Sequence, residues 1–199
     1  METDGKTTLH AVRRQLAEAA EIMEQMKGSC GDDIVVAARM ITDTVKNGGK
    51  VLWCGNGGSA AQAQHLSTEL VGGLRDHRRP PIASVSLTTD SSLLTAWSND
   101  LSFETVFSRQ VEALGRRGDI LLAISTSGNS SNILKAVETA RTIGIGIIIL
   151  TGREGGKLKD RGDLVIHIPS SDTQRIQEGH IAAGHIICEL VERAFMRST

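Results

Sequence analysis

Apolar residues recur at steps of three and four along the first quarter of the chain, beginning with Leu9, Val12, Leu16, Ala19, Met23 and Met26. This spacing places an apolar stripe on one side of a helix of about 20 residues, which we expect to end at Lys27 and Gly28. A second helix is predicted from about Asp32 to Asn47, because its apolar positions repeat in the same way and a glycine pair follows it. These helices are not needed to cover the first strand, so we expect residues 1–48 to form a subunit interface.

After these helices, short apolar runs alternate with helical segments. The runs lie at residues 50–54, 81–87, 119–125, 145–150 and 163–168, and a long closing helix is predicted from about Thr173 to Phe195. Strands that are apolar on both faces and alternate with helices indicate a parallel sheet covered on both sides. We therefore expect an α/β fold, a three-layer sandwich that is doubly wound around a five-stranded parallel sheet with right-handed crossovers. Residues 1–199 are expected to form a single domain with extra N-terminal helices.

The composition excludes several classes of protein. The 199 residues carry a net charge of −1, which creates no general attraction for nucleic acid, and the scarcity of aromatic residues argues against base-stacking modules. No apolar run approaches the roughly 20 residues of a membrane span, and the charged N-terminal segment does not resemble a secretion signal. We expect a cytoplasmic protein that binds neither nucleic acid nor membranes. Without a CxxC pair, Cys30, Cys54 and Cys188 are expected to be buried free thiols.

The loop after the third predicted strand carries four hydroxyl groups, on Ser125, Thr126, Ser127 and Ser130. Ligands of open parallel sheets bind beyond the carboxyl ends of the strands, and the N–H groups and dipole of the following helix favour an anion there. The alternative is an ordinary helix cap in a polar turn. Because the chain has neither a Walker motif nor GxGxxG, the expected anion is a sugar phosphate.

A glycine-rich loop, Gly55-Asn56-Gly57-Gly58-Ser59, follows the first predicted strand and lets the backbone approach a ligand closely. The helix after it carries His65 and Glu69 four residues apart, so both side chains lie on one helix face. This face could hold a metal or a proton-transfer site. The alternative is a solvated surface pair, which is the more common meaning of this spacing.

The closing helix is unusually polar for a helix that also carries many aliphatic residues. Gln177 and His185 lie about 12 Å apart along a straight helix axis, so both reach one ion only by leaning toward it or with the help of a neighbouring subunit. His180 is geometrically as eligible as His185, and either histidine could instead be a satisfied interface residue. The residues by themselves thus indicate a sugar-phosphate binder that could hold a divalent metal by nitrogen and oxygen ligands.

At these residues the chain resembles the bacterial phosphoheptose isomerases of the sugar isomerase (SIS) domain superfamily. The matching segments are residues 54–70, 86–100, 107–134, 150–156 and 168–192. The resemblance implies the sandwich fold, one zinc ion per subunit, and a homotetramer with active sites at subunit interfaces. It also implies the ketose–aldose isomerisation of sedoheptulose 7-phosphate to D-glycero-D-manno-heptose 7-phosphate, which is the first step of nucleotide-activated heptose biosynthesis.

The resemblance also assigns roles to individual residues. It implies the zinc ligands His65, Glu69, Gln177 and His185. It implies substrate contacts from Asn56, Gly57, Gly58, Glu69, Asn99, Asp100, Ser125, Thr126, Ser127, Ser130 and Gln177. Glu69 and His185 are the implied catalytic pair, with Glu69 moving a proton between C1 and C2 through an enediol and His185 moving the oxygen proton. A metal-bound carboxylate is a weaker base, so the two roles of Glu69 compete.

Two further features concern the alternative to an enzyme. A relative that binds the bacterial replication initiator has the same fold and hydroxyl loop but lacks the catalytic carboxylate and the late histidine. This chain has both, at Glu69 and His185, which favours an isomerase over a binding module. Several family members also have an arginine four residues after the catalytic glutamate, where this chain has Gly73. Arg75 could replace that arginine, and a variant substrate is the other possibility.

Overall fold

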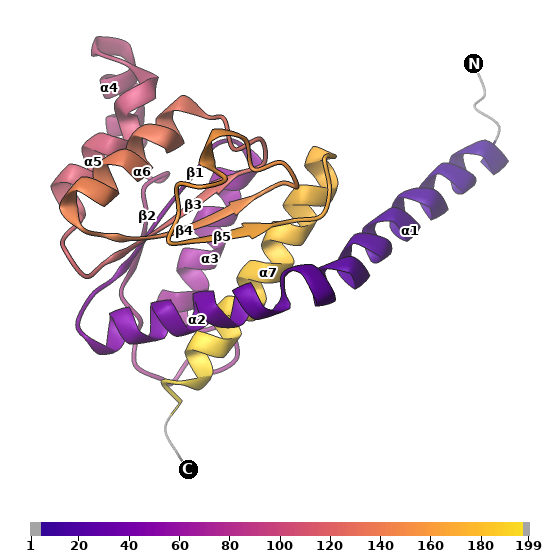
Figure 1. The fold of residues 1–199 in the computed structure, drawn as a ribbon, viewed down its shortest axis with the longest axis horizontal. Coiled ribbons are helices and arrows are strands. Elements are labelled where there is room, and N and C mark those ends of the chain that lie inside the picture. Colours follow the sequence, from indigo (N-terminus) through magenta and orange to yellow (C-terminus); the bar gives the residue numbers. More distant parts are fainter. Residues whose placement is uncertain (1–4, 197–199) are drawn as a thin grey trace.

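The structure, a computed structural model, describes residues 5–196 and is built around a central sheet. Five parallel strands lie in the order β2-β1-β3-β4-β5 (Figure 1). They are β1 (Val51–Gly55), β2 (Ser84–Ser86), β3 (Ile120–Ser125), β4 (Gly146–Thr151) and β5 (Leu164–His167). The predicted α/β fold with a five-stranded parallel sheet is therefore confirmed. β2 is shorter than the expected strand over 81–87, because the prolines that precede it lack the N–H that a strand ladder uses.

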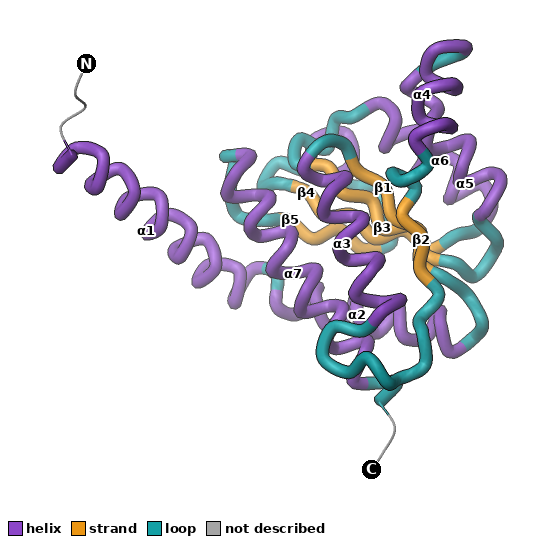
Figure 2. The backbone as a smooth tube through the Cα atoms, turned by 180° about the vertical axis from the view of Figure 1, so that it is seen from behind, coloured by secondary structure: helices purple, strands orange, loops and turns teal. Residues whose placement is uncertain are grey.

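Helices cover both faces of this sheet (Figure 2). They are α1 (Gly5–Ser29), α2 (Gly31–Lys46), α3 (Gly58–Gly72), α4 (Ser91–Asp100), α5 (Val106–Leu114), α6 (Ser131–Ile143) and α7 (Thr173–Arg193), with short 3-10 turns η1 (Phe103–Thr105) and η2 (Gly156–Leu158). Buried residues of α2, α3 and α7 form one core with the sheet, and those of α5 and α6 form the other. This is the three-layer arrangement that the alternating pattern predicts.

The central strands contribute side chains to both cores in alternation. In β1, Val51 and Trp53 pack with Leu66 of α3 and Ile187 of α7, whereas Leu52 packs with the helices of the opposite face. Every residue of β1 and β3 is buried. Full burial on both faces explains why these strands are apolar throughout, since each large apolar side chain removed from water contributes about 1.5–3 kcal/mol.

The N-terminal helices differ from the prediction in two respects. α1 does not end at Lys27 and Gly28 but continues to Ser29, and α2 begins at Gly31 almost without interruption. The sequence predicted only that the helices are not needed to cover the first strand; the structure shows that α2 belongs to the core of the sheet elsewhere, with Ile41 fully buried. The reason lies in the chain order. The connection from β4 to β5 contains only the turn η2, so no helix of its own covers the face beside β5, and α2 contacts β5 there.

α1 is the helix that extends away from the body of the molecule (Figures 1 and 2). Its apolar residues Leu9 and Leu16 are 49% and 67% exposed. The other end of the stripe is covered, because Met26 is buried in the core and Met23 packs against it. Exposed apolar residues in a row are unusual for a soluble helix. No helix between residues 5 and 196 combines the length and the apolar character that a membrane crossing needs.

The three cysteines are free and buried, as the sequence predicts. Burial raises the pKa of Cys54 to about 12. This thiol is therefore protonated at neutral pH and packs as a small apolar side chain.

Two close contacts define the edge of the sheet where the strands end. α3 and α7 lie so near each other that a Cβ on Gly184 would come within 2.4 Å of the side chain of Leu66. In the loops after β3 and β4, a Cβ on Gly128 would come within 1.9 Å of the carbonyl oxygen of Gly155, and Gly128 has a φ of +63°. Only glycine permits the approach at Gly128, where the neighbour is backbone and φ is positive; a side chain at Gly184 would require Leu66 to move.

Candidate functional site

Three polar side chains converge between α3 and α7. Nε2 of His65 lies 2.8 Å from Nε2 of His185 and 3.3 Å from Oε1 of Glu69. His65 and Glu69 come from successive turns of α3, and His185 comes from the adjacent part of α7. The i, i+4 pair of the sequence is therefore part of a three-residue cluster between two helices, and not an isolated surface pair.

The donor set of this cluster suits a divalent metal. One ligand atom from each of the three residues lies within 4.8 Å of the other two. In a tetrahedral zinc site with bonds of about 2.0–2.1 Å, neighbouring ligand atoms are about 3.3 Å apart, close to the separation of His65 and Glu69. Two imidazoles and one carboxylate are also a ligand set that zinc prefers. The cluster thus fits a metal with three protein ligands and a further open position.

Gln177, the fourth predicted ligand, lies near the start of the α3–α7 contact. Its amide group lies beside Gly58, where a Cβ would come within 2.4 Å of Nε2 of Gln177. Its backbone carbonyl accepts a hydrogen bond of 2.7 Å from Nε2 of Gln62. The side chain therefore lies beside the glycine loop, about two turns along α7 from His185. Its role as a metal ligand stays a prediction.

His180, which the sequence could not separate from His185, has a different environment. It is fully buried, and neither ring nitrogen has a hydrogen-bond partner. Burial lowers the pKa of His180 to about 4, with a smaller opposing effect from the backbone of Thr151. The ring is therefore neutral at physiological pH and belongs to the core between α7 and the sheet, so His185 is the histidine that meets His65.

The hydroxyl loop lies beside the glycine loop at the ends of β3 and β1. Ser125 is buried at the end of β3, and its Oγ lies 3.3 Å from Oγ of Ser130, the residue that precedes α6. The amides of Asn56 and Asn132 exchange two hydrogen bonds of 2.8 and 2.9 Å, which join the two loops. Because the sheet order reverses between β1 and β3, this is the switch point at which open α/β sheets bind ligands.

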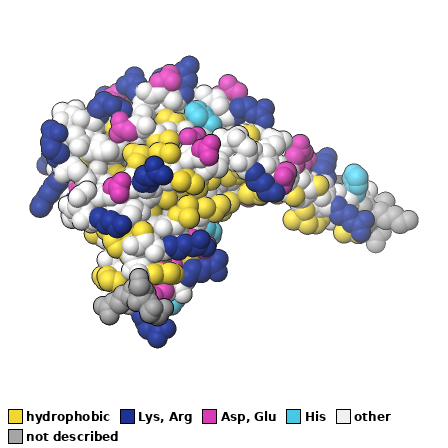
Figure 3. Space-filling model, turned by 60° about the horizontal axis from the view of Figure 1, so that its bottom comes forward, with side chains coloured by type: hydrophobic (Ala, Val, Ile, Leu, Met, Phe, Trp, Pro, Cys, Tyr) yellow, Lys and Arg dark blue, Asp and Glu magenta, His cyan; other side chains and the backbone are white. Residues whose placement is uncertain are grey.

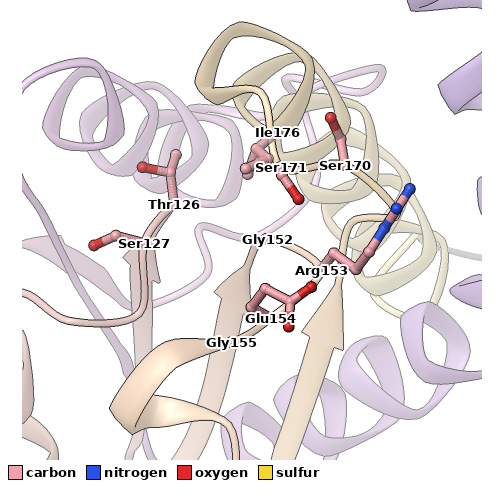
Figure 4. A pocket seen from close by; sticks show the side chains of 9 residues that line it. All are labelled: Thr126, Ser127, Gly152, Arg153, Glu154, Gly155, Ser170, Ser171 and Ile176. Atoms are coloured by element: carbon pink, nitrogen blue, oxygen red, sulfur yellow. The ribbon is translucent and has the colours of Figure 1, made fainter.

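A pocket of about 180 Å³ opens on the other side of the hydroxyl loop (Figure 4). It is lined by Thr126, Ser127, Gly152, Arg153, Glu154, Gly155, Ser170, Ser171 and Ile176. Figure 4 shows the hydroxyls of Thr126 and Ser127 turned away from Ser171. The pocket residues after β4 and β5 were not among the candidates that the sequence suggested. Their position after two predicted strands was the one signal for them, because serine and glycine are common in any loop.

Asn99 and Asp100 lie at the end of α4, which stands apart from the sheet in Figure 1. Both side chains are exposed, and the amide of Asn99 donates a hydrogen bond of 2.8 Å to Asp100. Within residues 5–196, no hydrogen bond joins this pair to the histidine cluster or to the hydroxyl loop. Their predicted substrate contact stays a prediction.

Gly73 and Arg75 show how this chain ends the helix that carries Glu69. Gly73 has a φ of +102°, and a Cβ there would come within 2.7 Å of the carbonyl oxygen of Asp76. This backbone leaves no room for an arginine at position 73, the residue that the family resemblance led us to expect there. The side chain of Arg75 is 67% exposed and pairs with Glu189 at 3.4 Å, so it lies on the surface and not at the cluster.

Comparisons with known proteins identify similar chains over nearly the whole length. A family model described as the SIS domain matches residues 15–152. A phosphoheptose isomerase of Akkermansia muciniphila is 50% identical over 182 residues, which cover 92% of this chain and 95% of that protein.

Solved structures are similar to the same extent. The phosphoheptose isomerase GmhA of Neisseria gonorrhoeae superposes with a TM-score of 0.87 at 42% identity, covering 94% of this chain and 99% of that one. A phosphoheptose isomerase of Francisella tularensis superposes with a TM-score of 0.90 at 35% identity, covering 94% and 98%.

The cluster geometry predicts metal binding that depends on His185. We expect His185→Ala to weaken Zn²⁺ binding by more than the roughly 10- to 100-fold that loss of an outer-shell partner costs, because a direct ligand is removed. Competition with a chromogenic chelator measures the affinity. His10→Ala, on the exposed face of α1, is the control and should bind zinc as the unmodified protein does. Equal affinities in both variants would show that zinc does not bind at the cluster.

The burial of His180 predicts a pH-dependent stability. The unfolded chain binds a proton near the ordinary pKa of 6.5, whereas the folded protein resists protonation down to about pH 4. Stability therefore falls as the pH drops through this interval, by about 2 kcal/mol between pH 7 and pH 5. His180→Leu should lose this part of the pH dependence, while His10→Leu should keep it. Urea unfolding at both pH values measures the difference, and identical slopes in the two variants would contradict the assignment.

Proposed function

The chain belongs to the SIS domain family and, within it, to the phosphoheptose isomerases, and we propose from this membership that it converts sedoheptulose 7-phosphate to D-glycero-D-manno-heptose 7-phosphate. The observation that carries the proposal is the convergence of His65, Glu69 and His185 between α7 and α3, the helix that follows the glycine loop at the switch point of the sheet. A cytoplasmic location is part of the same proposal, because the substrate is a phosphorylated sugar.

The phosphate of the substrate is assigned to the hydroxyl loop. Ser125 and Ser130 lie next to each other at the start of α6, where the helix dipole and free N–H groups favour an anion. Asn56 and Gly57 of the glycine loop lie beside them, held by the amide pair with Asn132. Gln177 reaches the same loop from α7 through its contact with Gly58. These residues hold the substrate, and none of them takes a proton from carbon.

Proton transfer is assigned to the cluster. Glu69 takes a proton from C1 of the ketose and returns it to C2, which passes the substrate through an enediol. His185 moves the proton between the two oxygens. Oε1 of Glu69 faces His65 at 3.3 Å, so we assign the carbon proton to Oε2. Dividing the two oxygens in this way lets one carboxylate hold a ligand position and still act as a base, which relieves the competition between its two roles.

The proposed metal is zinc, held by His65, Glu69 and His185, with Gln177 as the predicted fourth ligand. The support is the donor set and its spacing. A divalent metal, when bound beside a carbonyl, polarises it and stabilises negative charge on its oxygen. The protein contributes the placement, since α3 and α7 bring the three donors to one point.

We also propose a homotetramer. Hydrophobic side chains gather on the face from which α1 projects (Figure 3). A groove of about 350 Å³ on that side is lined by Met23, Met26, Lys27, Gly31, Ile34, Val35, Ala182, Ile186 and Leu190. Ile186 is 47% exposed and directly follows His185. A subunit that covered this groove would therefore come next to the cluster, as expected for active sites at subunit interfaces.

Paired variants separate proton transfer from phosphate binding. Glu69→Gln keeps the size of the side chain but removes its basicity, so turnover of sedoheptulose 7-phosphate should fall by at least about 10²- to 10⁴-fold, with substrate affinity within about tenfold of normal. Ser125→Ala combined with Ser127→Ala should instead lower affinity by about tenfold or more for each lost donor. Kinetics and calorimetry measure the two effects.

Two outcomes would change the proposal, one from these variants and one from a hydrogen-exchange measurement on the unmodified protein. Near-normal turnover by Glu69→Gln would remove this residue from the mechanism. If the unmodified protein with zinc exchanged neither the C1 nor the C2 proton of the substrate with deuterated solvent, the isomerase would be replaced by the alternative, a sugar-phosphate-binding module.

The assembly is tested by sedimentation. We expect a species of four times the 21.3 kDa chain mass. Leu16→Glu, on the exposed stripe of α1, should shift it to smaller species because a charge would be buried in the interface. Leu114→Glu, at the 44% exposed end of α5, is the matched control and should leave the tetramer unchanged. A fully active monomer would contradict a shared active site.

A further inference from the structure

A buried ion pair joins the far ends of α3 and α7, just beyond the cluster. Nε of Arg79 lies 3.0 Å from Oε1 of Glu192, and the two side chains are 1% and 0% exposed. Arg79 is in the loop after α3, and Glu192 is in the last turn of α7. Neither residue was singled out from the sequence, because a charged residue at the end of an amphipathic helix is normally solvated.

Glu192 also fixes the backbone of the loop that follows α3. Its Oε1 accepts hydrogen bonds from the N–H groups of Leu74 at 2.9 Å and Asp76 at 3.3 Å, and its Oε2 accepts one from Arg75 at 2.8 Å. With Arg79 this makes four donors on one carboxylate. Burial raises the pKa of Glu192, but the hydrogen bonds from three backbone N–H groups and from Arg79 outweigh burial and lower it, so the carboxyl is ionised at neutral pH.

Arg79 connects this carboxylate to Glu69. Nη2 of Arg79 donates a hydrogen bond of 2.8 Å to the backbone carbonyl of Glu69, and Nη1 donates one of 2.9 Å to the carbonyl of Pro80. The same Glu69 carbonyl accepts a bond of 3.1 Å from the N–H of Gly73 where the helix ends. The guanidinium of Arg79 thus connects the last turn of α3 to α7, the helix that carries His185.

The energetics of buried ion pairs indicate what this arrangement is for. An apolar pair of similar volume is often as stable as a buried ion pair or more stable, because both charges lose their hydration. The planar guanidinium and the carboxylate instead fix the orientation of the groups that they bind, since each hydrogen bond sets an angle as well as a distance. The bonds of this network end at the backbone of Glu69, one turn of α3 from His65.

We propose that Arg79 and Glu192 are positioning residues that hold the carboxylate of Glu69 in register with His65 and His185. This inference rests on the proposed function for its kinetic test, because it assigns Glu69 to the reaction. The expected geometry does not depend on the function: the relative positions of Glu69, His65 and His185 should change when the ion pair is removed.

The chain supplies a matched control for a buried carboxylate. Asp119, 4% exposed, accepts hydrogen bonds from the backbone N–H groups of Lys50 at 3.0 Å and Arg116 at 2.8 Å, and it pairs with the Lys50 ammonium. It has the same chemistry as Glu192 but lies where β3 begins, and its hydrogen bonds go to Lys50 and Arg116 and not to α3 or α7. Glu192→Gln and Asp119→Asn each remove one negative charge without a change of shape, and both should lower the melting temperature.

The first readout is kinetic. We expect Glu192→Gln to lower kcat by about 10- to 100-fold, the usual effect of losing a partner that orients an active-site group. KM should change by less than about threefold, because the phosphate contacts lie on other loops. Asp119→Asn should leave both constants near normal. Arg79→Lys keeps the charge but not the planar fork, and should give a kcat between those of Glu192→Gln and the unmodified enzyme.

The second readout does not need activity or metal. In metal-free protein labelled with ¹⁵N-histidine, the ring resonances of His65 and His185 at pH 7 should move in Glu192→Gln and stay in place in Asp119→Asn. If Glu192→Gln does not fold, Arg79→Lys replaces it in both measurements. Unchanged resonances and unchanged kcat in a folded variant would overturn the positioning role. An unmodified protein without isomerase activity would overturn the proposed function instead, and the resonances would still decide the positioning role.

Discussion

Gly184 of α7 packs against the side chain of Leu66 of α3, and the candidate site lies where these two helices meet. His65 and Glu69 are on one helix and His185 is on the other, more than a hundred residues later. A wider spacing between the helices would separate the imidazoles and leave an ordinary surface pair on α3. A Cβ on Gly184 would force the side chain of Leu66 to shift, so glycine at this position favours the close packing that brings the three donors together.

The sheet topology places a second group of residues next to that cluster. The order β2-β1-β3-β4-β5 puts the glycine loop after β1 beside the hydroxyl loop after β3, and the Asn56–Asn132 amide pair holds the two loops together. Segments far apart in sequence thus meet at one edge, and the glycine loop leads into the helix that carries His65 and Glu69. We propose that the loops at this edge bind the phosphate of the substrate and that the cluster transfers the proton.

Two parts of the surface of the chain are apolar. The stripe on α1 and the groove beside Ile186 are apolar and exposed in a single chain, whereas the cores on both faces of the sheet are closed. Arg79 and Glu192 stand out for the opposite reason, because they are charged and fully enclosed. Apolar groups outside and charges inside are both costly for a single chain, and for this reason we propose a function for each, association in one case and orientation in the other.

The sequence by itself determined the local features of this protein. The alternation of apolar runs and helices predicted the five parallel strands, and the order of the loops predicted which of them meet at the switch point of the sheet, because hydrophobic periodicity and strand direction are local properties. It did not determine where α2 packs, since the missing helix between β4 and β5 is a property of the whole chain order. It could not separate His185 from His180, because both lie on α7 and only the packing of α7 against α3 and the sheet buries one and brings the other to His65. The Arg79–Glu192 pair was invisible for the same reason, since burial and long-range contact exist only in the tertiary structure.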